Sequence, residues 1–188
     1  MAISLRMIAA PTDEDLLELS RRNPGFEFER SAEGELIVTP TGTRSGLREG
    51  ELFAQLHAWA RADGRGLAFG ASTGFRMPDG AVFAPDAAWV RRDRWDALAP
   101  EAQEGFAPRC PDAVFEVASP SNRSDALRAK LAAYLANGAQ LAVLIDSIGR
   151  VVEIHAPGQS PRVVEQPRSV VFSTVLTGFE LRLEPIFA

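Results

Sequence analysis

The stretch AVFEVASPSNRSDALRAKLAAYLANGAQLAVLID, residues 113–146, decides the fold. AVFEVA and LAVLID are apolar runs of strand length, typical of strands that are covered on both faces. Between them, Ser124 can cap a helix that runs to about Ala136, where Asn137-Gly138 forms a C-terminal stop. Strand, helix and strand in this order predict a crossover unit in a mixed sheet.

The segment before this unit predicts a helix, a hairpin and a second helix. Thr12 can cap a helix whose first turn is acidic and which ends near 23–25, an Asn-Pro-Gly breaker. FEFER and ELIVT alternate apolar and polar residues around the turn SAEG, which indicates a β-hairpin. A longer helix is expected over residues 45–62, stopped by Asp63-Gly64.

The remaining segments predict short elements. Residues 66–90 contain β-like pieces broken by Gly and Pro, and residues 91–106 indicate one or two short surface helices. RVVEIH is a strand, followed by weaker strands at PRVVEQ, near Val170 and at FELRL. We therefore expect one α/β (α+β) domain over residues 1–188, with a mixed sheet flanked by helices.

Composition excludes several classes of protein and site. Cys110 is the single cysteine and there are two histidines, which rules out an internal disulfide and argues against a thiolate-rich or His-based zinc site. No run of eighteen apolar residues exists, and the start MAISLRMIAAPTDED is a poor signal peptide, so we expect a cytoplasmic protein without a membrane span. The net charge of −5 disfavours tight non-specific binding of nucleic acid, but allows a local basic groove.

Two acidic residues stand at strand positions. Glu116 shares one face of its strand with Val114 and Ala118, where a carboxylate is costly to desolvate unless a cation or hydrogen bonds compensate it. Asp86 follows Pro85 and opens the strand DAAWV. Taken singly, each has an ordinary alternative: Glu116 as a structural ion pair, and Asp86 as a turn-forming aspartate.

Helical spacing adds two further groups. Glu49 falls in the middle of an apolar stripe of its helix and is expected to face the interior. Lys130, the only lysine of the chain, lies at the edge of the buried stripe formed by Leu127, Leu131 and Tyr134. Its alternative is an ordinary lysine that extends to solvent. Together, inward carboxylates can hold a hard divalent cation, and a nearby ammonium can orient or deprotonate water or stabilise charge on a phosphate.

The order PD, then E in a later strand, then K is similar to the PD-(D/E)XK nuclease superfamily. More narrowly, APDAAWVRRDRWDAL, the stretch from CPDAVFEVASPS to LAVLIDS, and LTGFELRL resemble the Uma family of restriction-type endonucleases. The resemblance implies a restriction-endonuclease-like mixed sheet flanked by helices. It also implies Mg²⁺ (or Mn²⁺) bound by Asp86, Glu116 and the backbone carbonyl of Val117. The position where many relatives carry lysine is Ala118, and Lys130 on the following helix fits a displaced lysine.

The resulting hypothesis is a Mg²⁺-dependent endonuclease that hydrolyses DNA with water as the nucleophile. Asp86 and Glu116 would bind the metal, Glu49 would assist, and Lys130 would position the water or stabilise the transition state. A set of arginines supplies candidate phosphate contacts: Arg91, Arg92, Arg94, Arg123 and Arg128. Alternatives are a catalytically inactive nuclease-fold module that binds DNA or protein, and glycoside hydrolysis by paired carboxylates. A homodimer would bring two sites to two DNA strands.

Overall fold

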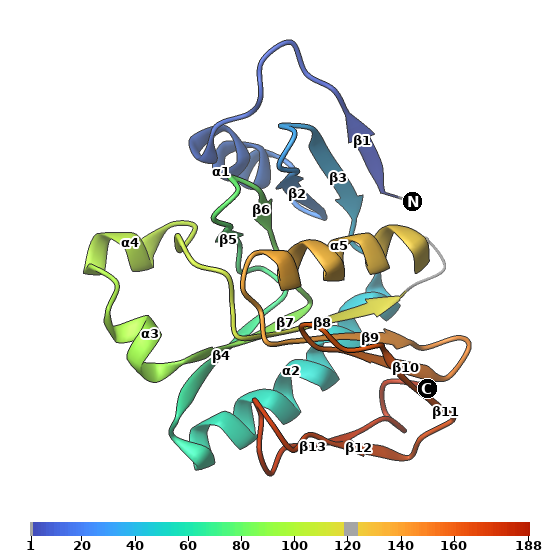
Figure 1. The fold of residues 1–188 in the computed structure, drawn as a ribbon. Helices are drawn as coiled ribbons and strands as arrows, with labels where there is room; N and C mark the ends of the chain where they lie inside the picture. Colours follow the sequence, from blue (N-terminus) through green and yellow to red (C-terminus); the bar gives the residue numbers. More distant parts are fainter. Residues whose placement is uncertain (1, 119–123) are drawn as a thin grey trace.

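The computed structural model describes residues 2–118 and 124–188, and its largest sheet is mixed (Figure 1). Six strands lie in the order β11-β10-β9-β8-β7-β4. Their bounds are β4 Gly66–Gly70, β7 Ala87–Arg91, β8 Ala113–Ala118, β9 Leu141–Asp146, β10 Val151–His155 and β11 Arg162–Glu165. β8 pairs with β9 in parallel, and the other neighbours run antiparallel. The predicted crossover unit β8–α5–β9 is confirmed, with α5 spanning Ser124–Ala136.

Two helices cover opposite faces of this sheet (Figure 1). α5 packs through Leu131 and Tyr134 against one face, whereas α2, Thr43–Asp63, packs through Leu52 and Leu56 against the other. The sheet face that packs against α2 is also covered by the C-terminal hairpin, which consists of β12, Ser169–Val171, and β13, Glu180–Arg182. α2 ends at Gly64, whose φ of 77° is a left-handed conformation that favours glycine.

A second sheet stands on the far side of α5 (Figure 1). Its five strands lie in the order β1-β3-β2-β6-β5, and all neighbours are antiparallel. Their bounds are β1 Ile3–Leu5, β2 Phe26–Arg30, β3 Leu36–Pro40, β5 Phe75–Arg76 and β6 Val82–Phe83. The hairpin β2–β3 confirms the sequence prediction, whereas β1 and the union with β5 and β6 were not predicted.

Helix α1, Asp13–Arg22, covers the outer face of the second sheet. It begins at a capping box in which Thr12 and Asp15 bond reciprocally, and it buries Leu16 against Leu36. The inner face of the same sheet contributes Ile37 to the core around α5. α5 therefore lies between the two sheets, and the side chains at this junction are partly shielded from water.

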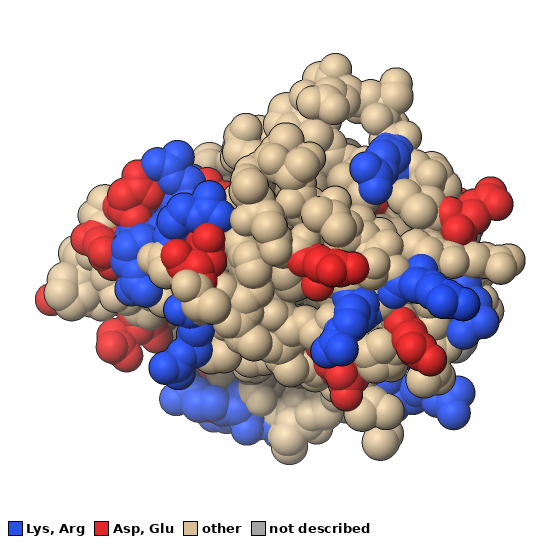
Figure 2. Space-filling model, turned by 90° about the horizontal axis from the view of Figure 1, so that it is seen from below, with Lys and Arg blue, Asp and Glu red and all other residues tan. Residues whose placement is uncertain are grey.

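Two short helices, α3 Arg92–Asp96 and α4 Pro100–Glu104, confirm the expected surface helices between β7 and β8. Within the described residues, no helix is long and apolar enough to cross a bilayer. On the face seen in Figure 2, which carries α2 and the C-terminal hairpin, basic and acidic side chains are interspersed with one another and with uncharged residues. This face shows no continuous basic surface.

Candidate active site

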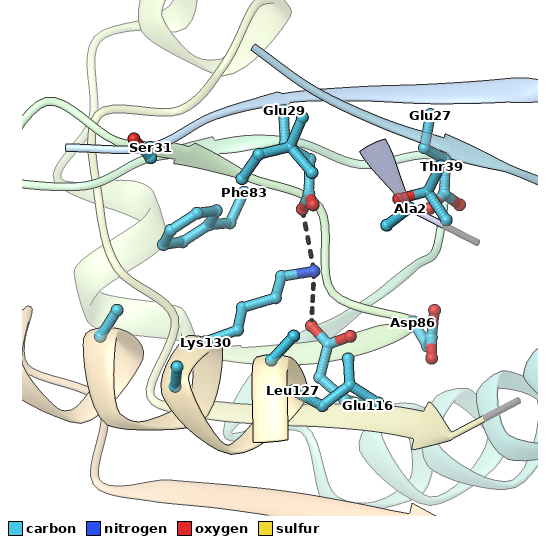
Figure 3. A pocket seen from close by; sticks show the side chains of 14 residues that line it. Ala2, Glu27, Glu29, Ser31, Thr39, Phe83, Asp86, Glu116, Leu127 and Lys130 are labelled. Atoms are coloured by element: carbon cyan, nitrogen blue, oxygen red, sulfur yellow. Dashed lines mark ion pairs between the residues drawn. The ribbon is translucent and has the colours of Figure 1, made fainter. Parts of the chain in front are cut away.

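A pocket of about 280 Å³ lies between the inner face of the second sheet, α5 and the adjoining ends of β7 and β8. Four carboxyl groups and one ammonium line it, while most of the other lining residues are apolar (Figure 3). The charged groups come from four segments: Glu27 and Glu29 from β2, Asp86 from the residue before β7, Glu116 from β8 and Lys130 from α5. Acidic groups thus outnumber basic ones in a partly dehydrated space.

Asp86 and Glu116 are placed side by side by the pairing of β7 with β8. Ala87 pairs with Phe115, so one further step of the antiparallel register sets Asp86 opposite Glu116 on the same face. The backbone N–H of Val117 donates to Asp86 Oδ2 at 2.6 Å, which holds the aspartate at the end of β8. This face is the one covered by α5, because Val114 and Ala118 pack in the same core as that helix.

Lys130 lies between the two sheets, and its ammonium has three close partners. Nζ lies 2.8 Å from Glu116 Oε1 and 2.8 Å from Glu29 Oε1, and donates to the carbonyl oxygen of Ala84 at 3.1 Å. Figure 3 shows Lys130 pointing from α5 across the pocket between the two glutamates. The Lys130 side chain is 15% exposed. The predicted position at the edge of the buried stripe of α5 is therefore confirmed. The alternative, a lysine that extends to solvent, does not match the structure.

Aromatic side chains surround this ammonium. Phe83 and Tyr134 each have the ring centroid 5.9 Å from Lys130 Nζ, within range of a cation–π contact. The Tyr134 hydroxyl donates to Glu116 Oε1 at 3.4 Å. Tyr134 is fully buried, and burial raises the pKa of its hydroxyl well above the ordinary value. At neutral pH it therefore acts as a donor to Glu116.

Burial raises the pKa of three pocket carboxyl groups to about 8: Glu27, Asp86 and Glu116. Neighbouring carboxylates add to the effect, whereas Lys130 opposes it. The pKa of Lys130 is raised well above its ordinary value, because the attraction of Glu116 and Glu29 outweighs burial. The pocket therefore holds a protonated amine beside acids whose ionisation further positive charge would favour.

Glu49 lies close to this group but on another wall. It is half-buried on α2, burial raises its pKa, and its charge raises the pKa of Asp86. Glu27 and Glu49 together line a neighbouring pocket of about 340 Å³. The expectation that Glu49 faces inward is confirmed, and its role stays a prediction.

The four predicted arginines that lie in the described part of the chain do not line the pocket. Arg91, Arg92 and Arg94 lie at the opposite end of β7 from Asp86, a strand of five residues that spans roughly 16 Å. Arg91 pairs with Asp93, and Arg94 pairs with buried Asp112 at 2.6 Å. On the outer side of α5, Arg128 Nη2 lies 2.7 Å from Glu153.

Arg123 lies outside the described residues, so the structure gives it no position. Glu27 and Glu29 were missed by sequence reasoning. Their alternation with Phe26 and Phe28 is the ordinary pattern of a hairpin with one face in water. Only the packing of this hairpin over α5 turns that face into a pocket wall, and no local signal in FEFER indicates it.

The pocket offers a divalent cation few protein ligands. Among residues 2–118 and 124–188, no group of three His, Cys, Asp or Glu side chains is close enough to hold a metal ion. Asp86 and Glu116 nevertheless stand adjacent, and in the same residues no basic side chain forms an ion pair with Asp86 or Glu27. Mg²⁺ is usually held by one or two carboxylates and several waters, which matches this donor set.

Comparison with known proteins identifies similar chains. A family model described as "Uma2: Putative restriction endonuclease" matches residues 13–184. A solved structure, described as a putative nuclease belonging to DUF820 from Anabaena variabilis, is similar with a TM-score of 0.72 and 19% identity, covering 92% of this chain and 97% of that chain. At this identity the likeness concerns the fold. No curated protein matches the chain.

Proposed function

The chain belongs to the Uma2 family of restriction-type endonucleases, and from this premise and the pocket we propose that it is a divalent-metal-dependent endonuclease that hydrolyses DNA. One observation carries the proposal. Asp86 and Glu116 lie opposite each other in a pocket where Lys130 Nζ is 2.8 Å from Glu116. Two acids for a cation, and a fixed ammonium beside them, are the groups that phosphodiester hydrolysis requires.

The carboxylates of Asp86 and Glu116, with the carbonyl of Val117, would hold Mg²⁺ or Mn²⁺. Such a cation polarises a phosphate oxygen and lowers the pKa of a water molecule. The chain itself aligns these ligands, because Val117 N–H fixes Asp86 at 2.6 Å and the strand register fixes Glu116 opposite. Glu49 and Glu27 would add negative charge that favours the cation without contacting it in the described geometry.

The surroundings of Lys130 favour positioning of the water and charge stabilisation over deprotonation of the water. Its raised pKa keeps the amine protonated at neutral pH, so it is a poor acceptor of a proton from water. A protonated amine can donate a hydrogen bond to the attacking water or to a phosphate oxygen, and can offset charge that develops there. We therefore assign Lys130 to positioning and charge stabilisation, and not to proton abstraction.

The finer parts of this proposal concern the substrate and its binding. The net charge of −5 makes DNA affinity depend on local arginines, for which Arg91, Arg92, Arg123 and Arg128 remain the candidates. Arg94 is no longer one of them, because its guanidinium is paired with buried Asp112. We also propose that the enzyme acts in the cytoplasm and that a homodimer presents two sites to a duplex. Light scattering with and without DNA measures that assembly.

The activity is tested by incubating supercoiled plasmid with the purified chain in excess Mg²⁺ or Mn²⁺, or in EDTA. We expect nicked and then linear plasmid with the cation and none in EDTA, and no cleavage by Asp86→Asn. The exposed Asp96→Asn is the matched control and is expected to cleave like wild type. A folded wild type that binds DNA but cuts nothing under either cation would favour the inactive nuclease-fold module.

A further inference from the structure

Glu29, Ala84 and Lys130 form a closed set of contacts at the junction of the two sheets. Glu29 Oε1 accepts from the backbone N–H of Ala84 at 2.7 Å and lies 2.8 Å from Lys130 Nζ. Lys130 Nζ in turn donates to the carbonyl oxygen of Ala84 at 3.1 Å. The Glu29–Lys130 pair therefore takes up both polar backbone groups of one residue.

This arrangement accounts for every hydrogen of the ammonium. A lysine ammonium has three donors and no acceptor. Among the residues that the structure describes, Lys130 has three close partners, Glu29, Glu116 and the carbonyl of Ala84, and these match its three donors. For Lys130 to act on a substrate, it must give up one of these partners.

Of the two glutamates, Glu116 is the one that a metal ion would bind, because it lies opposite Asp86. Glu29 lies on the opposite sheet and, among the described residues, forms no hydrogen bond with Asp86. Glu29 is 5% exposed, and its cross-strand partner Ile37 packs in the core around α5. It can keep its contact with Lys130 when Glu116 turns to another cation. The hydrogen that had pointed at Glu116 would then be directed into the pocket.

We propose that Glu29 is a positioning residue, which holds the Lys130 ammonium in the pocket and leaves one of its hydrogens free for the substrate once Glu116 is engaged by a metal ion. The catalytic consequence rests on the proposed nuclease function, but the hold of Glu29 on Lys130 does not. The same contact steadies Ala84, which is joined through Pro85 to the metal-binding candidate Asp86. Glu29 thus connects the second sheet both to the Lys130 ammonium and to the segment that carries Asp86.

Because Lys130 is the only lysine, an amine-acylating reagent followed by peptide mass spectrometry reports on this one side chain, separately from the N-terminal amine. We would compare wild type with Glu29→Gln, which keeps the size of the side chain and removes its charge. Glu33→Gln, exposed in the turn of the same hairpin, is the matched control. Labelling is measured without divalent ions, so that it does not depend on metal binding or cleavage.

We expect Lys130 in folded Glu29→Gln to be acylated at least tenfold faster than in wild type, and Glu33→Gln to match wild type. An acylation rate within twofold of wild type in folded Glu29→Gln overturns the proposal. Glu29→Asp retains the charge on a shorter stem, and we expect an intermediate rate. If Glu29→Gln does not fold, an unchanged rate in Glu29→Asp overturns the proposal in its place.

Cleavage kinetics separate positioning from a purely structural role. With plasmid in Mg²⁺, Glu29→Gln is expected to lower kcat at least tenfold while KM for DNA changes less than threefold, and Glu29→Asp to recover part of kcat. Equal kcat in wild type and folded Glu29→Gln contradicts the proposal. If wild type itself does not cleave, the proposed function fails, and the acylation rates still decide whether Glu29 holds Lys130.

Discussion

The ammonium of Lys130 lies 2.8 Å from Glu116 Oε1, and both residues belong to the same strand–helix unit, β8–α5. The helix that closes the core over β8 thus also brings a cation to the buried acid of that strand. Glu116 is 3% exposed, and it tolerates this position because Lys130 and Tyr134 supply donors. The packing of the crossover unit and the chemistry of the pocket therefore depend on the same contact.

Replacing Lys130 by Met leaves Glu29 and Glu116 buried without their shared cation. Breaking a buried ion pair from one side costs about 3–5 kcal/mol, and losing a preorganised donor lowers kcat roughly 10²–10³-fold. We expect both effects. Urea unfolding and plasmid cleavage measure them; an unchanged urea midpoint at pH 8 would show that the pair contributes nothing.

Asp86→Asn is expected to stabilise the metal-free protein while removing its metal response. Burial and the charge of Glu49 raise the pKa of Asp86 to about 8, so the ionised form is unfavourable in the folded state. An amide can still accept from Val117 N–H, and a gain of about 1 kcal/mol corresponds to roughly 2–4 °C in Tm for a chain of this size. Thermal melts at pH 8.5 test this, and a lower Tm than that of Asp96→Asn would contradict it.

Stability without metal should fall as pH rises from about 4 to 8. The carboxyl groups of Glu27, Asp86 and Glu116 have pKa values of about 8 in the folded protein, against an ordinary value of about 4 when unfolded. Between these values the folded state binds more protons, so unfolding becomes more favourable with rising pH. Tm measured from pH 5 to 8.5 checks the slope, and a flat profile in EDTA would exclude these shifts.

The sequence predicted the β8–α5–β9 unit and the hairpin because their signals are local: apolar runs, a helix stop and strict alternation. The union of the hairpin with β5 and β6 was not predictable, since β6 has two residues, Val82–Phe83, and pairs with a strand about fifty positions away. β1 was missed for the same reason: three residues leave too little periodicity to recognise.

The candidate site was predicted in its central part. Asp86, Glu116 and Lys130 line one pocket, and Glu49 lines the neighbouring pocket. Glu29 could not be found, because its burial arises when two sheets enclose α5, a relation between distant segments that alternation in β2 does not encode. The site was therefore predictable where β8, α5 and the start of β7 supply its residues, and not predictable where the second sheet completes it.

Arg94→Ala should affect folding and not DNA binding. Arg94 Nη1 bonds Asp112 Oδ1 at 2.6 Å, and Asp112 is 4% exposed. Leaving a buried acceptor without this partner costs about 1–3 kcal/mol. Exposed Arg92→Ala is the comparison, with stability expected within about 0.5 kcal/mol of wild type. Chemical unfolding and the salt dependence of DNA affinity separate the two; weaker DNA binding by Arg94→Ala at full stability would restore it as a phosphate contact.

Isothermal titration of Mg²⁺ and Mn²⁺ into wild type, Asp86→Asn and Glu116→Gln tests most directly whether this pocket is a metal centre. The account predicts saturable binding by wild type, accompanied by release of protons at pH 7 because the ligand carboxyl groups have raised pKa values. Binding should be lost in both folded variants and kept in Asp96→Asn. Folded wild type that binds neither cation, or variants that bind as wild type does, would contradict the account.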